Sequence, residues 1–274
     1  MPVPLPSDVL LVQYTDQMGR LVRLPAKPRR IVSLVPSQTE LLFDLGLEEA
    51  VVGLTKFCVH PAGKKKEKII IGGTKNFHFA TIDRLQPDLI LGNKEENYRE
   101  GIEQLAEKYP VWMSDIHNLE EALIMIRQIG QITGTAEEAA RLTQKIAEGF
   151  ACLRPLPSLR VVYLIWKDPY MSVGGDTFIQ EMLVRCGLEN VFALKARYPQ
   201  VSPSDLAEAA PQAILLSSEP YPFREKHRKE LQSICPGAVV KLVDGEMFSW
   251  YGSRLQQAPS YLQSLVAELA EKVK

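Results

Sequence analysis

The stretch RRIVSLVPSQTEL, residues 29–41, decides the fold of this chain. The β-branched residues at the start of Ile31–Val35 predict a buried strand. Ser37 and Glu40 have the spacing of a capping box, in which the serine hydroxyl accepts from the first helical turn and the glutamate reaches back. Gly46 is a suitable residue to end the helix, because glycine adopts left-handed backbone angles without strain. The stretch therefore predicts one β–α unit.

The same alternation recurs along the chain. In the first half, strands are expected at Val51–Leu54, Asp88–Leu91 and Val111–Met113, with a helix over Asn93–Lys108. In the second half, strands are expected at Val161–Trp166, Ala213–Ser217 and Val239–Val243, and a final helix begins near Pro259. Strands that alternate with helices are typical of an α/β fold with parallel sheets.

A long helix is expected between the two halves. Thr135 and Glu138 form a cap signal, and Pro155 and Pro157 would end the helix that runs from Ala136 to about Leu153. A helical connector keeps two lobes at a nearly fixed separation, whereas a Gly/Ser linker does not. We therefore predict two Rossmann-like α/β lobes joined by one backbone helix. The expected bounds are 1–134 for the first lobe, 135–157 for the helix and 158–274 for the second lobe.

A weak internal repeat relates the two halves. Leu85–Leu91 is similar to Ala209–Leu215, and in each segment a helix ends at a proline and a buried strand begins. Two explanations stay open at the level of sequence. The halves arose by duplication, or the similarity reflects only that helix–proline–strand junctions are common.

Composition excludes several classes of function. Charged residues make up 24% of the chain and the net charge is −1, without the basic stripe that nucleic-acid binding requires. No apolar stretch approaches the roughly 20 residues of a membrane span. The four cysteines show neither zinc-ligand spacing nor a disulfide framework. There is no P-loop, nucleophile elbow or zinc-protease motif, so we expect no catalytic constellation and no required cofactor.

The N-terminal segment bears on location. Met1–Asp16 has no lysine or arginine, and its apolar run Val9–Val12 is too short for a secretion signal. The sequence as it stands is therefore expected in the cytoplasm, or in the periplasm if a signal has been removed.

Aromatic residues near predicted strand ends are the best candidates for ligand binding. Phe248, Trp250 and Tyr251 form a dense cluster in a loop after a strand. Trp166 and Tyr170 lie just past another strand, where α/β proteins gather their ligand sites. Such rings suit a flat macrocycle. The alternative is that Trp166 and Phe248 belong to the core.

These pieces together resemble a known family, the periplasmic binding proteins for cobalamin and iron-siderophores. The resemblance extends from about Tyr14 to Leu262. Its matching segments are Thr15–Arg20, Leu24–Pro25, Arg29–Leu41, Leu85–Leu91, Gly174–Phe192 and Tyr198–Ser202. It implies two α/β lobes joined by a long helix, with the ligand in the cleft between them. Members of this family hand their ligands to an ABC transporter and catalyse nothing.

The resemblance also implies further site residues. Three tryptophan positions in the cleft of the cobalamin receptor correspond here to Thr74, Asn93 and Tyr198. Arg254 matches a family arginine and is expected to bind carboxylates or phosphates, or else to form a salt bridge at the start of the last helix. His60 would face the same rim, either as an axial ligand to cobalt or iron or as a hydrogen-bonded loop residue.

One departure from the family concerns transport. Family receptors commonly carry a surface glutamate on each lobe that docks on the permease, and the corresponding positions here are Ala80 and Ser204. Asp83 and Asp205 lie nearby as substitutes. The departure suggests a relative that is not secreted and does not serve as a transport receptor.

The predicted function is therefore a binding protein that holds a metal chelate, either a corrinoid such as cobalamin, or haem, or an iron-siderophore, in the cleft. The chelate is the expected partner. The first alternative is the solute receptor of an ABC transporter, with a permease as a second partner. The other alternative is an enzyme acting on a tetrapyrrole or chelate, for which the sequence shows no acid–base pair.

Overall fold

The structure is a computed structural model that describes residues 11–25, 27–154 and 158–273. By its internal contacts the chain divides into two compact units. The first unit comprises Met1–Ile116, Glu120–Gln144 and Tyr251–Ser253, and the second comprises His117–Leu119, Lys145–Trp250 and Arg254–Lys274.

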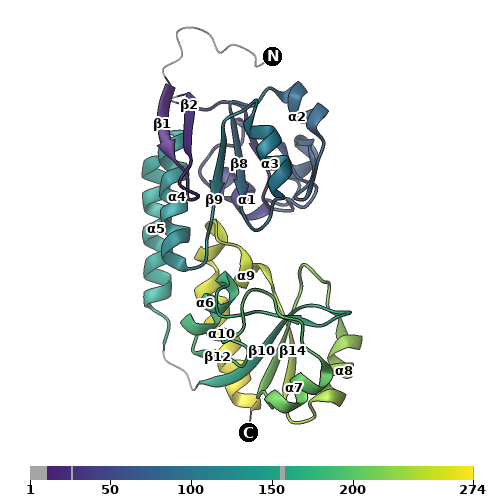
Figure 1. The fold of residues 1–274 in the computed structure, drawn as a ribbon. Coiled ribbons are helices and arrows are strands. Elements are labelled where there is room, and N and C mark those ends of the chain that lie inside the picture. Colours follow the sequence, from purple (N-terminus) through teal and green to yellow (C-terminus); the bar gives the residue numbers. More distant parts are fainter. Residues whose placement is uncertain (1–10, 26, 155–157, 274) are drawn as a thin grey trace. The chain divides into compact units, whose positions relative to one another are not determined.

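The first unit contains a parallel sheet with strand order β5-β4-β3-β8-β9 (Figure 1). Its strands are β3 (Ile31–Ser33), β4 (Val51–Leu54), β5 (Ile69–Ile70), β8 (Leu89–Asn93) and β9 (Val111–Ser114). Its helices are α1 (Pro36–Asp44), the 3-10 turn η1 (Lys64–Glu67), α2 (Phe79–Leu85), α3 (Arg99–Ala106) and most of α4 (Leu119–Thr133). Two short antiparallel ribbons complete it, β1 (Leu11–Thr15) with β2 (Leu21–Pro25) and β6 (Gly72–Gly73) with β7 (Asn76–Phe77).

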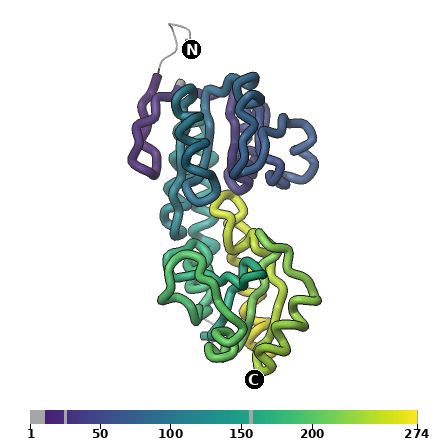
Figure 2. Tube along the Cα trace, turned by 45° about the vertical axis from the view of Figure 1, so that its right-hand side comes forward, coloured from purple at the N-terminus to yellow at the C-terminus, as the bar shows by residue number. Residues whose placement is uncertain are grey.

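The β1–β2 hairpin lies beside α4 in both the ribbon and the tube view (Figure 2). Its turn is attached at two points, because the Gln17 backbone donates to the carbonyl of Met113 at 3.1 Å and its side chain donates to that of Glu121 at 2.9 Å. The hairpin therefore anchors the end of β9 and the first turn of α4.

The second unit repeats this plan. A parallel sheet is formed by β12, β10, β13 and β14, with β11 antiparallel against the end of β10. Its strands are β10 (Leu159–Trp166), β11 (Met171–Ser172), β12 (Leu188–Asn190), β13 (Ala213–Ser217) and β14 (Val239–Val243). Its helices are α6 (Phe178–Arg185), α7 (Pro203–Ala209), α8 (Glu225–Ile234), α9 (Glu246–Ser249), most of the 3-10 turn η2 (Ser253–Gln256) and α10 (Ala258–Lys272). The predicted fold class, two α/β units with parallel sheets, is confirmed.

The helix expected between the lobes is α5 (Ala136–Ala151). The division between the two compact units falls inside it, after Gln144. Pro155 and Pro157, which were expected to end it, lie outside the described residues.

An arginine anchor recurs at the start of each sheet. Arg30 donates from its guanidinium to the carbonyl of Leu85 at the end of α2, at 2.8 and 2.6 Å. Arg160 donates in the same way to the carbonyl of Ala209 at the end of α7, at 2.8 Å. Both helices then end in a residue with left-handed backbone, Gln86 with φ 43° and Ala210 with φ 42°. A shared detail of this kind favours duplication over a chance similarity of junctions.

Two expected helix starts are wrong. The helix α1 begins at Pro36 with Val35 as its N-cap, so Ser37 lies inside the first turn and caps nothing. The fixed φ of proline suits the first helical position, which places the start before the serine. The helix expected from Asn93 begins only at Arg99. Asn93 instead accepts from the backbones of Glu95 and Glu96 at 2.9 and 3.1 Å, and this side-chain turn replaces the first helical turn.

The described residues offer no resident metal site. No group of three or more His, Cys, Asp or Glu side chains among them could hold an ion. The four cysteines are free thiols, with Cys58, Cys186 and Cys235 buried and Cys152 exposed.

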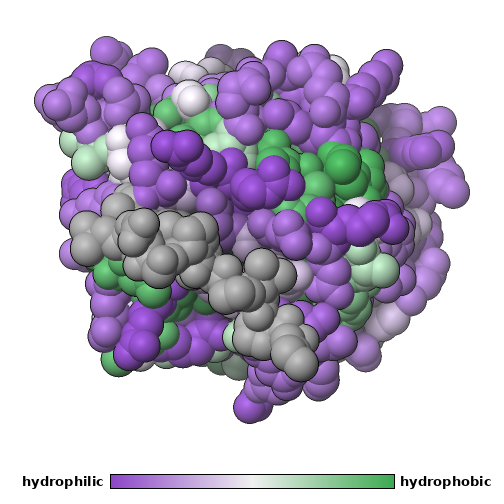
Figure 3. Space-filling model, turned by 90° about the horizontal axis from the view of Figure 1, so that it is seen from above, coloured by the Kyte–Doolittle hydropathy of each residue, from purple (hydrophilic) through white to green (hydrophobic). Residues whose placement is uncertain are grey.

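Within the same described ranges, every helix is too short or too polar to cross a membrane. On the face drawn in Figure 3, hydrophilic side chains predominate and apolar ones gather in separate patches.

Candidate ligand-binding site

The carboxyl edge of the first sheet rests on a buried polar layer. Gln38 donates to the hydroxyl of Ser114 at 2.6 Å, and Asn93 donates to the same hydroxyl at 3.0 Å. All three side chains are fully buried or nearly so. Asn97 donates to the carbonyl of Thr74 at 3.0 Å and thereby fixes the β6–β7 turn to this layer. A connected network of this kind holds the edge rigid.

This layer determines what two of the predicted site residues do. Asn93 is 2% exposed and its amide is used in the network, so the structure gives it a supporting position. Thr74 is half-buried, and its side chain lines a hollow at the surface of the first unit. A ligand contact by either residue stays a prediction.

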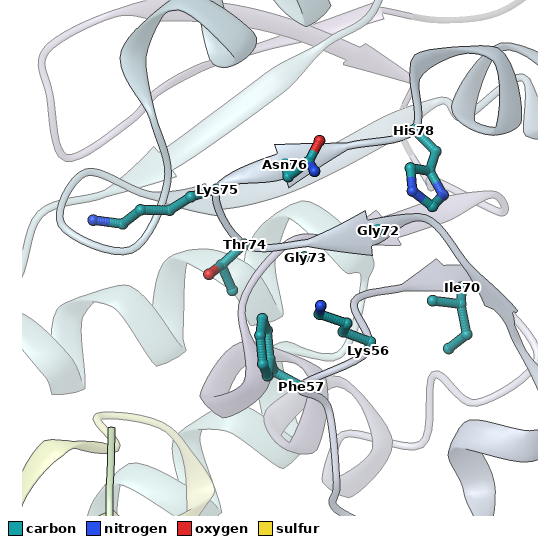
Figure 4. A pocket seen from close by; sticks show the side chains of 9 residues that line it. All are labelled: Lys56, Phe57, Ile70, Gly72, Gly73, Thr74, Lys75, Asn76 and His78. Carbon is teal, nitrogen blue, oxygen red and sulfur yellow. The ribbon is translucent and has the colours of Figure 1, made fainter. Parts of the chain in front are cut away.

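The hollow lies between the loop after β4 and the β6–β7 ribbon, and its volume is about 440 Å³ (Figure 4). The ring of Phe57 forms one wall and is 50% exposed, which is unusual for so large an apolar side chain. The ammonium of Lys56 lies 5.1 Å from the centre of that ring. The lining residues are Lys56, Phe57, Ile70, Gly72, Gly73, Thr74, Lys75, Asn76 and His78.

Cys58 and His60 follow in the same loop. The thiol of Cys58 is buried, 3.0 Å from the hydroxyl of Thr39 and 3.2 Å from that of Thr55. Burial raises its pKa, so it stays protonated and unsuited to metal binding. His60 is half-buried, and its role as an axial ligand stays a prediction.

The carboxyl edge of the second sheet carries an aromatic cluster. Trp166 ends β10 and is 41% exposed. Its ring meets that of Tyr221 edge-on at 5.6 Å, and Tyr221 in turn meets Phe223 at 4.8 Å. Sequence reasoning missed Tyr221 and Phe223, although they follow the predicted strand that ends at Ser217. The exposed ring of Trp166 is thus held in place by its contact with Tyr221.

A buried histidine stiffens this cluster. The Nδ1 atom of His227 accepts from the backbone of Arg224 at 2.9 Å, and its Nε2 atom lies 3.3 Å from the hydroxyl of Tyr221. In the neutral ring the proton therefore sits on Nε2. Burial, together with the positive charges of Lys226 and Lys167, lowers the pKa of His227 and favours this neutral form.

Tyr170, another predicted ligand residue, is 7% exposed. Its hydroxyl donates to Glu230 at 2.6 Å, and Lys167 pairs with the same carboxylate. Burial, and then the hydrogen bond to Glu230, raise the pKa of Tyr170. The hydrogen bond from Lys167 is the largest cause that lowers the pKa of Glu230. Tyr170 thus links β10 to α8, and its part in binding stays a prediction.

The aromatic segment expected as a loop is partly helical, because Phe248 lies in α9, and its residues have different environments. Phe248 is fully buried and packs against Tyr163 at 4.9 Å and Tyr261 at 6.3 Å, in the core of the second unit. Its burial supports the core alternative, and a ligand contact would require that core to open. Tyr251 is 5% exposed. Tyr198 is half-buried under the guanidinium of Arg197, 5.4 Å from its ring centre.

Trp250 and Arg254 are held by two carboxylates. The indole of Trp250 donates to Glu219 at 2.9 Å, and the hydroxyl of Ser249 donates to the same oxygen at 2.7 Å. Arg254 lies over the ring of Trp250 at 5.2 Å and pairs with Glu246 at 3.2 Å. The salt bridge foreseen as the alternative for Arg254 is therefore present. Burial raises the pKa of Glu219, although both hydrogen bonds oppose the shift.

The docking positions compared with transport receptors lie on α2 and α7. Ala80 and Ser204 are exposed there. Their acidic neighbours serve local structure, because Asp83 accepts from Tyr109 at 2.7 Å and pairs with Lys108 at 3.0 Å, while Asp205 forms a capping box with Ser202. The hydrogen bond from Tyr109 is the largest cause that lowers the pKa of Asp83.

Comparisons with known proteins agree with this architecture. Among solved structures, the chain is similar to the periplasmic haem-binding protein RhuT from Roseiflexus sp. RS-1, with a TM-score of 0.78 and 23% identity over 90% of this chain and 99% of that one. It is also similar to the periplasmic vitamin B12 binding protein BtuF of Vibrio cholerae, with a TM-score of 0.71 and 20% identity over 89% and 99%. These likenesses show the fold.

Sequence relatives point the same way. The chain is 28% identical over 203 residues to the vitamin B12-binding protein of Pectobacterium carotovorum subsp. carotovorum (strain PC1), which covers 71% of this chain and 73% of the relative. The corresponding protein of Yersinia pestis (strain Pestoides F) is 27% identical over 79% and 77%. These relatives are substrate-binding proteins and not enzymes. A family model described as periplasmic binding protein matches residues 31–233, so this chain belongs to the periplasmic binding protein family.

Proposed function

We propose that the chain binds a metal chelate, either a corrinoid such as cobalamin, or haem, or a ferric siderophore. The observation that carries the proposal is the exposed ring of Trp166, supported by Tyr221. Phe57 on the first unit has a similar exposed ring. Exposed rings at strand ends offer flat apolar faces to a ligand. The relatives named above bind vitamin B12 or haem according to their names.

The chelate in this proposal is cargo. The described residues contain no cluster of their own that could hold a metal ion, so the metal would arrive with its ligand. The half-buried imidazole of His60 is our candidate for an axial bond to that metal.

The test is a titration with cobalamin, cobinamide, haemin and a ferric siderophore, following the visible spectrum and tryptophan fluorescence. We expect saturable binding of at least one, and roughly tenfold weaker binding by Trp166→Ala, because a central aromatic contact contributes more than about 1 kcal/mol. Leu194→Ala is the control, since Leu194 is fully exposed on the same unit. A band shift lost in His60→Ala would assign the axial ligand. Saturation by none of these ligands would refute the proposal.

A second candidate, favoured by family membership, is the solute receptor of an ABC permease. Asp83 and Asp205 would provide the acidic contacts, since they lie on α2 and α7 next to Ala80 and Ser204. Uptake of labelled cobalamin by cells carrying Asp83→Lys with Asp205→Lys should then fall, while binding by the purified variant stays unchanged. Unchanged uptake would leave the chain as a binding protein without a permease. Cell fractionation tests the cytoplasmic location expected from the sequence.

A further inference from the structure

The hollow on the first unit has positive charge without a counter-charge. Of its lining residues, two are lysines and none is an aspartate or glutamate. Neither Lys56 nor Lys75 forms an ion pair within the described part of the chain. Some other lysines of this unit are paired, for example Lys64 with Glu48 at 2.7 Å and Lys94 with Asp115 at 2.5 Å. A cationic hollow of this kind attracts an anion.

The backbone around Lys56 is fixed, which gives the hollow a defined shape. The amide of Lys56 donates to the carbonyl of Gly72 at 2.9 Å, and its own carbonyl accepts from the ammonium of Lys65 at 2.7 Å. In Figure 4 the ammonium of Lys56 points to the centre of the hollow below Gly73, whereas Lys75 extends away along the rim. Lys56 is therefore the principal charge inside.

Gly73 keeps the hollow open. A Cβ atom at this position would lie 3.2 Å from the Phe57 ring and 3.6 Å from the Cε atom of Lys56. A larger residue would therefore fill the space between the β6 strand and these two side chains. One small volume is therefore lined by the ring of Phe57, the ammonium of Lys56 and the backbone of Gly73.

We propose that this hollow binds a carboxylate or phosphate arm of the ligand, so that the chain prefers metal chelates with anionic side groups. Its volume of about 440 Å³ suits a side group with a few carbons. Small-molecule sites span roughly 300–1,000 Å³, and this value is near the lower end. The ring of Phe57 accommodates the carbons while Lys56 binds the charge. The preference rests on the proposed function, but the anion site itself does not.

The anion site is tested first without any chelate. Inorganic pyrophosphate is titrated at low salt, because charges are screened over about 10 Å at 0.1 M. Amide NMR signals of Gly73 and Thr74 should shift saturably, with roughly tenfold weaker binding by Lys56→Gln, as expected for a hydrogen bond to a charged group. Lys66→Gln removes an exposed charge of the same loop outside the hollow and should bind as the wild type does. Absence of a saturable shift, or equal affinity of Lys56→Gln, would overturn the site.

The preference among chelates is tested with matched pairs. Haemin is compared with its dimethyl ester for a carboxylate arm, and cobinamide phosphate with cobinamide for a phosphate arm. Lys56→Gln should weaken binding of the anionic member of a pair roughly tenfold and leave the other unchanged. Equal loss, or no loss, for both members would overturn the preference. If no chelate binds the wild type, the proposed function fails, and the pyrophosphate titration alone decides the anion site.

Discussion

We expect the stability of the second unit to depend on pH through Glu219. Burial, the largest cause, raises its pKa in the folded chain above the ordinary value, while Ser249 and Trp250 donate to it and oppose the shift. A carboxyl whose pKa is raised on folding contributes stability below its unfolded pKa of about 4.3, and this contribution is lost as the pH rises through the folded pKa.

We therefore expect the wild type to gain stability relative to Glu219→Gln as the pH falls from neutral toward this range. Urea unfolding at a series of pH values measures the difference in the free energy of unfolding between the two proteins. Glu208→Gln, a substitution of an exposed glutamate on α7, is measured as the control. Parallel profiles for the wild type and Glu219→Gln would contradict the assignment.

Individual site residues were only partly predictable from sequence. Trp166 could be found because it ends a continuous apolar run, after which α/β proteins place ligand contacts. Phe248 could not be distinguished from Trp250 and Tyr251 by sequence, since only its packing against Tyr163 and Tyr261 shows that it belongs to the core. Tyr221 was missed because it lies in an irregular segment, and its contact with His227 of α8 follows no residue periodicity.

The helix α7 ends in a left-handed backbone conformation that disfavours alanine. Ala210 ends this helix with φ 42°, a conformation that costs an alanine roughly 1–2 kcal/mol and glycine little. Ala210→Gly should therefore stabilise the protein by about 0.5 kcal/mol, after allowing for the greater freedom of glycine in the unfolded chain. Ala207→Gly, inside the same helix and also exposed, should destabilise by about 0.5–1 kcal/mol. Thermal unfolding of both variants measures the sign of each change in stability. Two changes of the same sign would contradict the prediction.

Elements were more predictable than their ends. The strands β3, β8, β10, β13 and β14 were located by continuous apolar runs, which parallel strands buried on both faces require. Helix starts failed where a side chain or a proline competed with the expected cap. At Asn93 the amide forms a turn of its own, and at Pro36 the ring takes the first helical position. Such competition depends on single hydrogen bonds, which cannot be predicted from the residue spacing of cap signals.

At the scale of the whole chain, two units with separate cores should lose structure separately. Phe248→Leu, in the core of the second unit, should cost about 1–2 kcal/mol. Hydrogen exchange of the amides in β13 should then accelerate roughly tenfold, while exchange in β8 stays unchanged. Leu91→Ala, in the core of the first unit, should give the reverse result. Equal acceleration in both strands would mean that the chain unfolds as one cooperative body.

Of the four cysteines, Cys152 is the one expected to react readily with thiol reagents in the folded protein. Burial raises the pKa of Cys58, of Cys235 and of Cys186, the last to about 12, so these three thiols react slowly in the folded protein. Cys152 is exposed just after α5. A maleimide dye should therefore label the native protein at one position and the denatured protein at four. The wild-type chain can be immobilised or made fluorescent at that position for every titration proposed above, without first removing a cysteine.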